Sequence, residues 1–149
     1  MLSNNLKWCR EELELTQEQL GNILNVSRKT ISGWENVNDP IPLAKLIEFC
    51  DKFNYSLDFA MGFTRKNQSS KLTSKFSKSS ISKNLKKTRQ SLNLSQEEFA
   101  GNCGLSQTTY NHYETGYNLI TTTNLYYICK TYNISMDYMV GRTKNQKFK

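Results

Sequence analysis

The chain has 149 residues and a mass of 17.3 kDa, enough for one average domain or two small ones. Hydrophobic residues make up 37%, and no apolar run approaches the roughly 18 residues of a membrane helix, so a soluble protein without a membrane span is expected. Four scattered cysteines and a single histidine exclude a disulfide framework and a multi-histidine zinc site, and favour a reduced, cytoplasmic setting, while the net charge of +7 raises the question of a nucleic-acid partner.

The sequence repeats itself with an offset of 79 residues. Residues 5–64 align with residues 84–143 without a gap, and 19 of the aligned positions are identical. The identical polar pairs include Arg10/Arg89, Gln17/Gln96, Ser27/Ser106 and Glu35/Glu114. The chain therefore holds two copies of one unit of about 60 residues, a size that folds alone with marginal stability.

The first copy carries helix signals in a regular order. Apolar residues at helical spacing predict a first helix over residues 6–13. The Thr-Gln-Glu-Gln sequence from residue 16 is a capping-box pattern, which predicts a second helix that ends near Leu24. Ser27 predicts the N-cap of a third helix, and Pro42 predicts the first turn of a fourth.

A fifth short helix is predicted between Ser56, as its N-cap, and Gly62, because glycine suits a left-handed helix end. The matching signals of the second copy are Ser95, Ser106, Thr121, Ser135 and Gly141. No strand periodicity is present, and only two prolines and seven glycines are available for turns. The sequence therefore predicts an all-α fold.

The basic charge is concentrated outside the two copies. Residues 65–83 hold six Lys/Arg and no acid, and the last eight residues add four more, whereas residues 1–64 have a charge of −3. The Ser/Lys-rich composition between the copies is typical of a solvated tether. The predicted organisation is a first domain at 1–64, a flexible basic linker at 65–82, a second domain at 83–143 and a basic tail at 144–149. The predicted domains therefore have no basic face that would argue for DNA binding. The argument for DNA binding must come from sequence motifs.

Residues 16–21 followed by residues 26–35 resemble the helix-turn-helix of Cro and phage-repressor proteins, the xenobiotic-response-element type. Residues 95–114 resemble it a second time. The resemblance implies two tandem five-helix, phage-repressor-like domains, joined by the basic Ser/Lys linker, in which each third helix enters the major groove of DNA. It also implies one partly buried ion pair in each domain, Arg10 with Glu35 and Arg89 with Glu114.

Helical geometry separates two faces of each third helix. Ile31 and Trp34 point inward in the first domain, as do Tyr110 and Tyr113 in the second. The outward positions are the candidates for base contact: Arg28, Lys29, Ser32 and Gly33, then Gln107, Thr108, Asn111 and His112. Arginine can bridge guanine, Asn or Gln can bridge adenine, and Thr can meet a thymine methyl. By resemblance, Gln17 and Gln96 bond a DNA phosphate and help to position the base-reading residues.

These residues predict a regulator of transcription, a repressor, that binds double-stranded DNA and reads one operator half-site with each third helix. No Gly-rich phosphate loop, metal cluster or catalytic acid pair is recognisable, so neither an enzyme nor a cofactor is expected. The alternative is a protein-binding module, such as an antitoxin, a phage-encoded inhibitor or a dimerisation unit. The −3 charge of residues 1–64 favours this alternative for the first domain, and a homodimer stays open as well.

Overall fold

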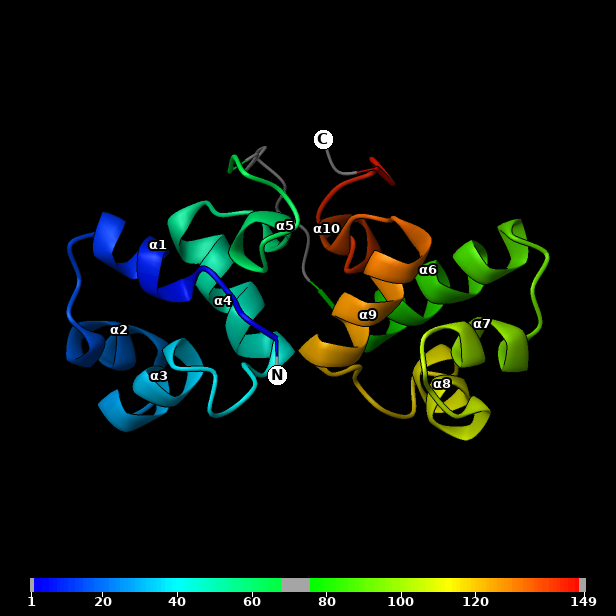
Figure 1. Cartoon of the computed structure of the whole chain (residues 1–149), viewed down its shortest axis with the longest axis horizontal. Helices are drawn as coiled ribbons and strands as arrows, with labels where there is room; N and C mark the ends of the chain where they lie inside the picture. The colour runs from blue at the N-terminus through cyan, green and yellow to red at the C-terminus, as the bar shows by residue number, and fades with distance from the viewer. Residues whose placement is uncertain (1, 68–75, 148–149) are drawn as a thin grey trace. The chain divides into compact units, whose positions relative to one another are not determined.

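The computed structural model describes residues 2–67 and 76–147, which form two compact units (Figure 1). Unit 1 is residues 2–67 and unit 2 is residues 76–147. Each has five helices, and no strand occurs among the described residues. The prediction of an all-α chain with two five-helix units is confirmed.

The helices follow the predicted order in both units. Unit 1 consists of α1 (Leu6–Glu12), α2 (Gln17–Leu24), α3 (Arg28–Glu35), α4 (Leu43–Phe53) and α5 (Leu57–Ala60). Unit 2 consists of α6 (Lys78–Ser91), α7 (Gln96–Asn102), α8 (Gln107–Glu114), α9 (Thr122–Tyr132) and α10 (Met136–Met139). None of these described helices is long and apolar enough to cross a membrane.

The predicted caps are in place. The Gln19 amide donates to Thr16 Oγ1 at 3.0 Å, and Gln19 Oε1 accepts the Thr16 amide at 2.8 Å, which completes the capping box of α2. The second copy repeats this box at the start of α7. Ser27 and Ser106 cap α3 and α8 through bonds of 3.1 Å. Pro42 is the N-cap of α4, so it lies just before the helix and not within its first turn.

Each unit has its own core, built from equivalent positions. Leu6, Leu20, Ile31, Leu46 and Leu57 are buried in unit 1. Their counterparts in unit 2 are Leu85, Phe99, Tyr110, Leu125 and Met136, which are also buried. Unit 2 thus carries two aromatic rings where unit 1 has aliphatic side chains, and the Phe99 and Tyr110 ring centroids lie 4.9 Å apart. In both units this core supports the inner face of the third helix.

The structure differs from the predicted linker at both of its ends. Residues 78–82 are helical, because Ser77 caps α6 through the Ser80 amide at 3.0 Å and because Ile81 is buried in line with Leu85. At the other end, Asn67 Oδ1 accepts the Ser56 amide at 2.9 Å, so residues 65–67 fold back onto unit 1. The remainder of the predicted linker, residues 68–75, lies outside the described residues.

The predicted basic tail is also attached to its unit. The backbone oxygen of Gln146 accepts the Ser135 amide at 2.8 Å, and Gln146 Nε2 donates to the Tyr138 hydroxyl at 3.2 Å. Gln146 is the counterpart of Asn67, and both residues satisfy the amide of the serine that caps the last helix. The repeat therefore extends beyond the predicted domain ends, and residues 148–149 lie outside the described part.

These corrections change the charge of the units. Unit 2 has nine Lys/Arg against four Asp/Glu, a net charge of +5, while unit 1 has eight against nine, a net charge of −1. Arg142, which lies inside the predicted second domain, has its guanidinium buried in an ion pair with Asp137. Most of the described basic excess therefore belongs to the folded unit 2.

Candidate nucleic-acid interface

The inner faces of the third helices, α3 and α8, pack against the core of their units. Ile31 and Tyr110 are 0% exposed, and Trp34 and Tyr113 are 4% and 5% exposed, which confirms the predicted inward positions. In unit 1 the turn before α3 is tight: a Cβ at Gly21 would lie 2.7 Å from the Val26 carbonyl oxygen. Glycine is therefore needed at this point for α2 and α3 to approach each other.

Seven of the eight candidate base contacts are open to solvent. Arg28 and Lys29 are exposed and Ser32 is half-buried in α3. In α8, Gln107 and Thr108 are exposed, and Asn111 and His112 are half-buried. These side chains lie on the side of each helix away from the core.

Gly33 is the exception and corrects the prediction, because it is buried. Its carbonyl oxygen accepts the amides of Asn38 at 2.9 Å and Asp39 at 3.2 Å, and a Cβ at Gly33 would lie 2.7 Å from Asp39 Oδ2. The loop after α3 covers this position. His112 is its counterpart in α8 and also faces the following loop, with its ring centroid 4.9 Å from that of Tyr117.

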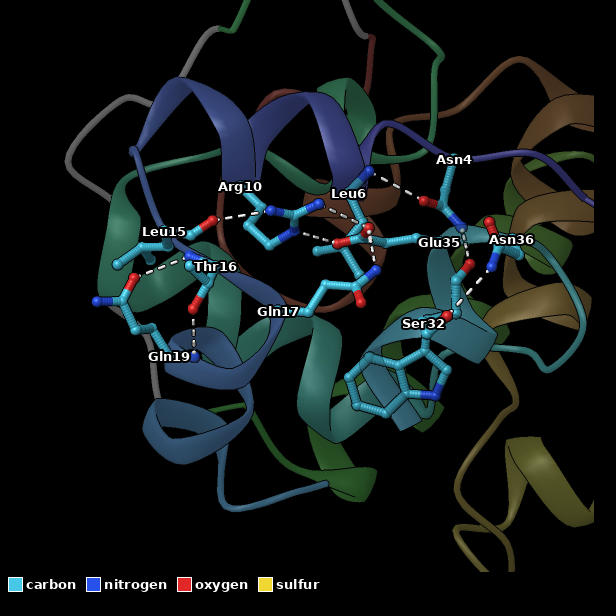
Figure 2. Close-up of polar contacts among 11 residues, drawn as sticks. Asn4, Leu6, Arg10, Leu15, Thr16, Gln17, Gln19, Ser32, Glu35 and Asn36 are labelled. Carbon is cyan, nitrogen blue, oxygen red and sulfur yellow. Dashed lines mark hydrogen bonds and ion pairs between the residues drawn. The ribbon is translucent and has the colours of Figure 1, made fainter. Parts of the chain in front are cut away.

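A bidentate ion pair ties the first helix of each unit to the end of the third. In unit 1, Arg10 Nε and Nη2 donate to Glu35 at 2.6 and 3.0 Å, and Arg10 Nη1 donates to the Leu15 carbonyl at 2.8 Å (Figure 2). The Glu35 side chain is only 1% exposed. In unit 2, Arg89 repeats these three bonds at 2.9, 2.8 and 3.0 Å, with Glu114 4% exposed. The partly buried pairs implied by the family resemblance are therefore present.

The ion pairs hold both arginines in their charged form. The hydrogen bond to the carboxylate raises the pKa of each arginine, Arg10 and Arg89. Burial acts to raise the pKa of Glu114, but the bonds from Arg89, Tyr110 and Gln96 outweigh it and bring the pKa below its ordinary value. A buried pair of this kind mainly fixes geometry, here the position of the third helix.

The two glutamines that begin α2 and α7 point toward the third helices. Gln17 Nε2 donates to Glu35 Oε1 at 3.1 Å (Figure 2). Gln96 makes the matching bond to Glu114 at 3.2 Å and also donates to Asn111 Oδ1 at 3.1 Å. Both glutamines thus connect the start of the second helix with the ion pair.

Unit 2 extends this network to its outward face. Gln107 Nε2 donates to Gln96 Oε1 at 3.3 Å, so Gln96 is bonded to two candidate base contacts, Gln107 and Asn111. In unit 1 the counterpart of Asn111 is Ser32, whose Oγ accepts from Asn36 Nδ2 at 3.1 Å. Within the described residues no hydrogen bond holds the side chain of Arg28. We define the reading network as Arg89, Glu114, Gln96, Asn111 and Gln107.

Sequence reasoning placed Gln96, Gln107 and Asn111 individually but missed the bonds among them. The residues belong to two helices, and the distance between their side chains depends on the angle at which α7 and α8 pack. No spacing along the sequence encodes that angle. Among the described residues no group of three or more His, Cys, Asp or Glu side chains is arranged to hold a metal ion.

Comparison with known proteins gives a family and one relative. The sequence model of the helix-turn-helix family matches the chain twice, at residues 6–59 and 85–139. Antitoxin PezA from Streptococcus pneumoniae serotype 4 is 36% identical over 64 residues, which are 43% of this chain and 40% of the antitoxin. The chain thus matches less than half of this relative's length. No solved structure matches the chain.

Proposed function

The chain belongs to the Cro/C1-type helix-turn-helix family of DNA-binding transcription regulators, and from this premise we propose that it is a repressor whose two units read two unlike halves of one operator. The family is a regulatory one and not a catalytic one. The observation that carries the proposal is the pair of third helices, each held by a buried ion pair and each presenting different polar side chains.

In unit 2 the outward amides are suited to adenine. Because Asn111 Oδ1 accepts the Gln96 amide, the Asn111 Nδ2 donor and the second lone pair of Oδ1 are left for adenine N7 and N6. Gln107 offers the same pair of groups one helical turn away. Bonds made before binding reduce the side-chain entropy that is lost on binding, which favours tight and selective contact.

In unit 1 the outward cations are suited to guanine. The exposed Arg28 guanidinium can donate two parallel bonds to guanine O6 and N7, and Lys29 can donate one. The Ser32 hydroxyl can hydrogen-bond to either base, while Gly33, which the following loop covers, makes no base contact. The first half of the operator therefore contains guanine, and the second half is rich in adenine.

Gln17 and Gln96 serve both halves in the same way. Each is the first residue of its helix, where free backbone amides are available for a phosphate. Their side chains are half-buried against the third helix, so a phosphate bound at this point would set the distance between the backbone of DNA and the reading residues.

Selection of bound duplexes from a random pool tests the proposal. We expect a bipartite consensus with one guanine-containing and one adenine-rich half. A perfect palindrome would contradict unlike reading, since two identical units from separate chains would then occupy it and the protein would act as a homodimer through one unit. A pool without enrichment would contradict sequence-specific binding altogether.

A protein contact of unit 1 is the second candidate function. The name of the relative, an antitoxin, and the net charge of −1 on unit 1 favour it. In this case unit 2 alone would bind DNA, and changes at Arg28 would leave the selected consensus unaltered. The same selection experiment therefore separates the two candidates.

A further inference from the structure

The first helix of unit 2 is twice as long as its counterpart in unit 1. α6 has 14 residues and α1 has seven. The added turns, together with the residues that follow them, carry three exposed lysines, Lys78, Lys83 and Lys86. These lysines line a hollow of about 430 Å3 together with Glu114, Thr115 and Gly116 from the end of α8 and the loop after it.

The hollow is a formed feature of unit 2, because a hydrogen bond joins α6 to the end of α8. The Ser82 hydroxyl lies 2.8 Å from the Tyr113 carbonyl oxygen and 2.8 Å from the Lys78 carbonyl oxygen, and its one hydrogen is shared between these two acceptors. Gly116 has a φ of +80°, and a Cβ there would lie 3.3 Å from Ser82 Oγ. Ser82 is itself buried, so the two walls of the hollow meet at a close contact that a side chain at position 116 would crowd.

The charge of the hollow is positive. The one acidic residue that lines it is Glu114, whose side chain is 4% exposed and accepts hydrogen bonds from Arg89 and Gln96. The three lysines make no ion pair within the described residues, so their ammonium groups face solvent without an acidic partner.

The hollow adjoins the reading network. Glu114 lines the hollow and at the same time accepts the amide of Gln96, which contacts Asn111 on the reading face. The lysines therefore lie beside the C-terminal end of the helix whose N-terminal part presents Gln107 and Asn111. A duplex seated on that N-terminal part carries its phosphates past both ends of the helix.

The lysines of this hollow are only partly matched in unit 1. The position of Lys83 is occupied by Asn4, whose Nδ2 donates to the Trp34 carbonyl at 3.1 Å. Trp34 is the counterpart of Tyr113, so the same carbonyl is satisfied by Asn4 in one unit and by Ser82 in the other. The position of Lys86 is occupied by Lys7, so the two units share this one charge.

Resting on the proposed function, we propose that this lysine hollow binds backbone phosphates of the duplex that α8 reads, which makes unit 2 the electrostatic anchor of the protein on DNA. The phosphates lie beyond the bases that Gln107 and Asn111 contact. The anchor adds affinity for every sequence, while the amides of the reading network supply the preference for adenine.

The test removes the three charges in the full chain. Affinity for a random-sequence duplex is measured from about 50 to about 200 mM salt for the wild type and for the variant Lys78→Ala/Lys83→Ala/Lys86→Ala. We expect the variant to lose at least about 10-fold in affinity, and its slope of log affinity against log salt to fall by about one for each phosphate released. Replacement of the same three lysines by arginine should restore the slope.

A matched control removes the same charge from another surface of unit 2. Lys87, Lys144 and Lys147 line a separate hollow beside Tyr138, and their triple alanine variant carries an identical net charge. We expect this control to stay within about threefold of the wild type. Equal losses in both variants would overturn the proposal, because net charge alone would then explain the effect.

A second readout locates the contact. In a duplex selected by the wild type, ethylation of single phosphates should interfere with binding at positions outside the bases affected by Asn111→Ala. In the lysine-hollow variant, ethylation at these positions should no longer change binding. Unchanged interference in that variant would overturn the anchor. Absence of salt-dependent binding by the wild type would instead overturn the proposed function itself.

Discussion

The two units share one framework but differ in what the framework supports. In unit 1, Glu35 accepts hydrogen bonds from Arg10 and from Gln17, and the series of bonds ends at Gln17. The outward side chain of Arg28 is not part of this series. In unit 2 the equivalent bonds continue to Asn111 and Gln107. One scaffold therefore presents a cationic surface outside the bonded framework in one copy, and an amide surface held by hydrogen bonds in the other.

The distribution of identical residues agrees with this division. The arginine, the glutamate and the glutamine of the framework are the same in both copies. The four candidate reading positions differ in every case: 28 from 107, 29 from 108, 32 from 111 and 33 from 112. A tandem repeat can thus keep its packing while each copy acquires its own recognition chemistry.

The largest expected effect comes from breaking the ion pair of unit 2. Arg89→Met leaves the buried Glu114 carboxylate without its cation, and we expect unit 2 to lose about 3–5 kcal/mol of stability. Both tryptophans of the chain, Trp8 and Trp34, belong to unit 1, so tryptophan fluorescence follows that unit while circular dichroism follows both. In urea, the dichroism transition should shift and the fluorescence transition should not. A shift of both would contradict independent units.

The next effect concerns base contact by unit 1. Arg28→Ala should cost about 1–3 kcal/mol of binding to a selected duplex and relax the preference at one base position. The matched control is Lys52→Ala, which removes one exposed charge from α4. If Arg28→Ala weakened binding to all sequences equally, the arginine would contact a phosphate and not a base. This result would contradict the claim that unit 1 reads guanine while unit 2 reads adenine.

A smaller effect is expected from the glutamines, and it should differ between the units. Gln96→Ala removes the bond that orients Asn111 and should cost about 1 kcal/mol, together with part of the adenine preference. Gln17→Ala removes the matching phosphate contact but no bond to an outward side chain of α3, so it should weaken binding and leave the base preference of the guanine half unaltered. Selected consensus sequences of the two variants provide the measurement, and equal broadening of both halves would contradict the network's role.

The smallest effect is a pH dependence of unit 2. The folded-state pKa of Glu114 is depressed, so its charge contributes stability that is complete above the ordinary value of 4.5 and is lost as the pH falls through the depressed value. Acid titration followed by circular dichroism should show this loss, and Glu114→Gln should weaken the dependence. An unaltered acid transition in Glu114→Gln would show that another group is responsible.

Local signals in the sequence were enough for the fold. Capping residues such as Thr16, Ser27 and Ser106 marked helix starts, and apolar spacing identified Ile31 and Trp34 as inner residues. These features act within one or two helical turns, so the sequence alone contains them. Because the sequence repeats after 79 residues, the same helix signals occur twice, and both copies predict the same five-helix unit.

Features that depend on packing were missed. The first turn of α6 is rich in Ser and Lys and has the composition of a tether, yet Ile81 finds a buried place in the core of unit 2. Gly33 lies on an outward-looking position of its helix, but the following loop folds over it. The bond from Gln96 to Asn111 depends on the relative placement of two helices. None of these contacts can be predicted from the spacing of residues within one helix.

An exchange of reading residues tests the central claim most directly. The double variant Arg28→Gln/Ser32→Asn gives unit 1 the amides that unit 2 carries at the equivalent positions, beside a Gln17 that already bonds Glu35. Selection from a random duplex pool should then yield two adenine-rich halves in place of one, with the second half unchanged. A consensus identical to that of the wild type would contradict the claim that each unit reads its own half through these side chains.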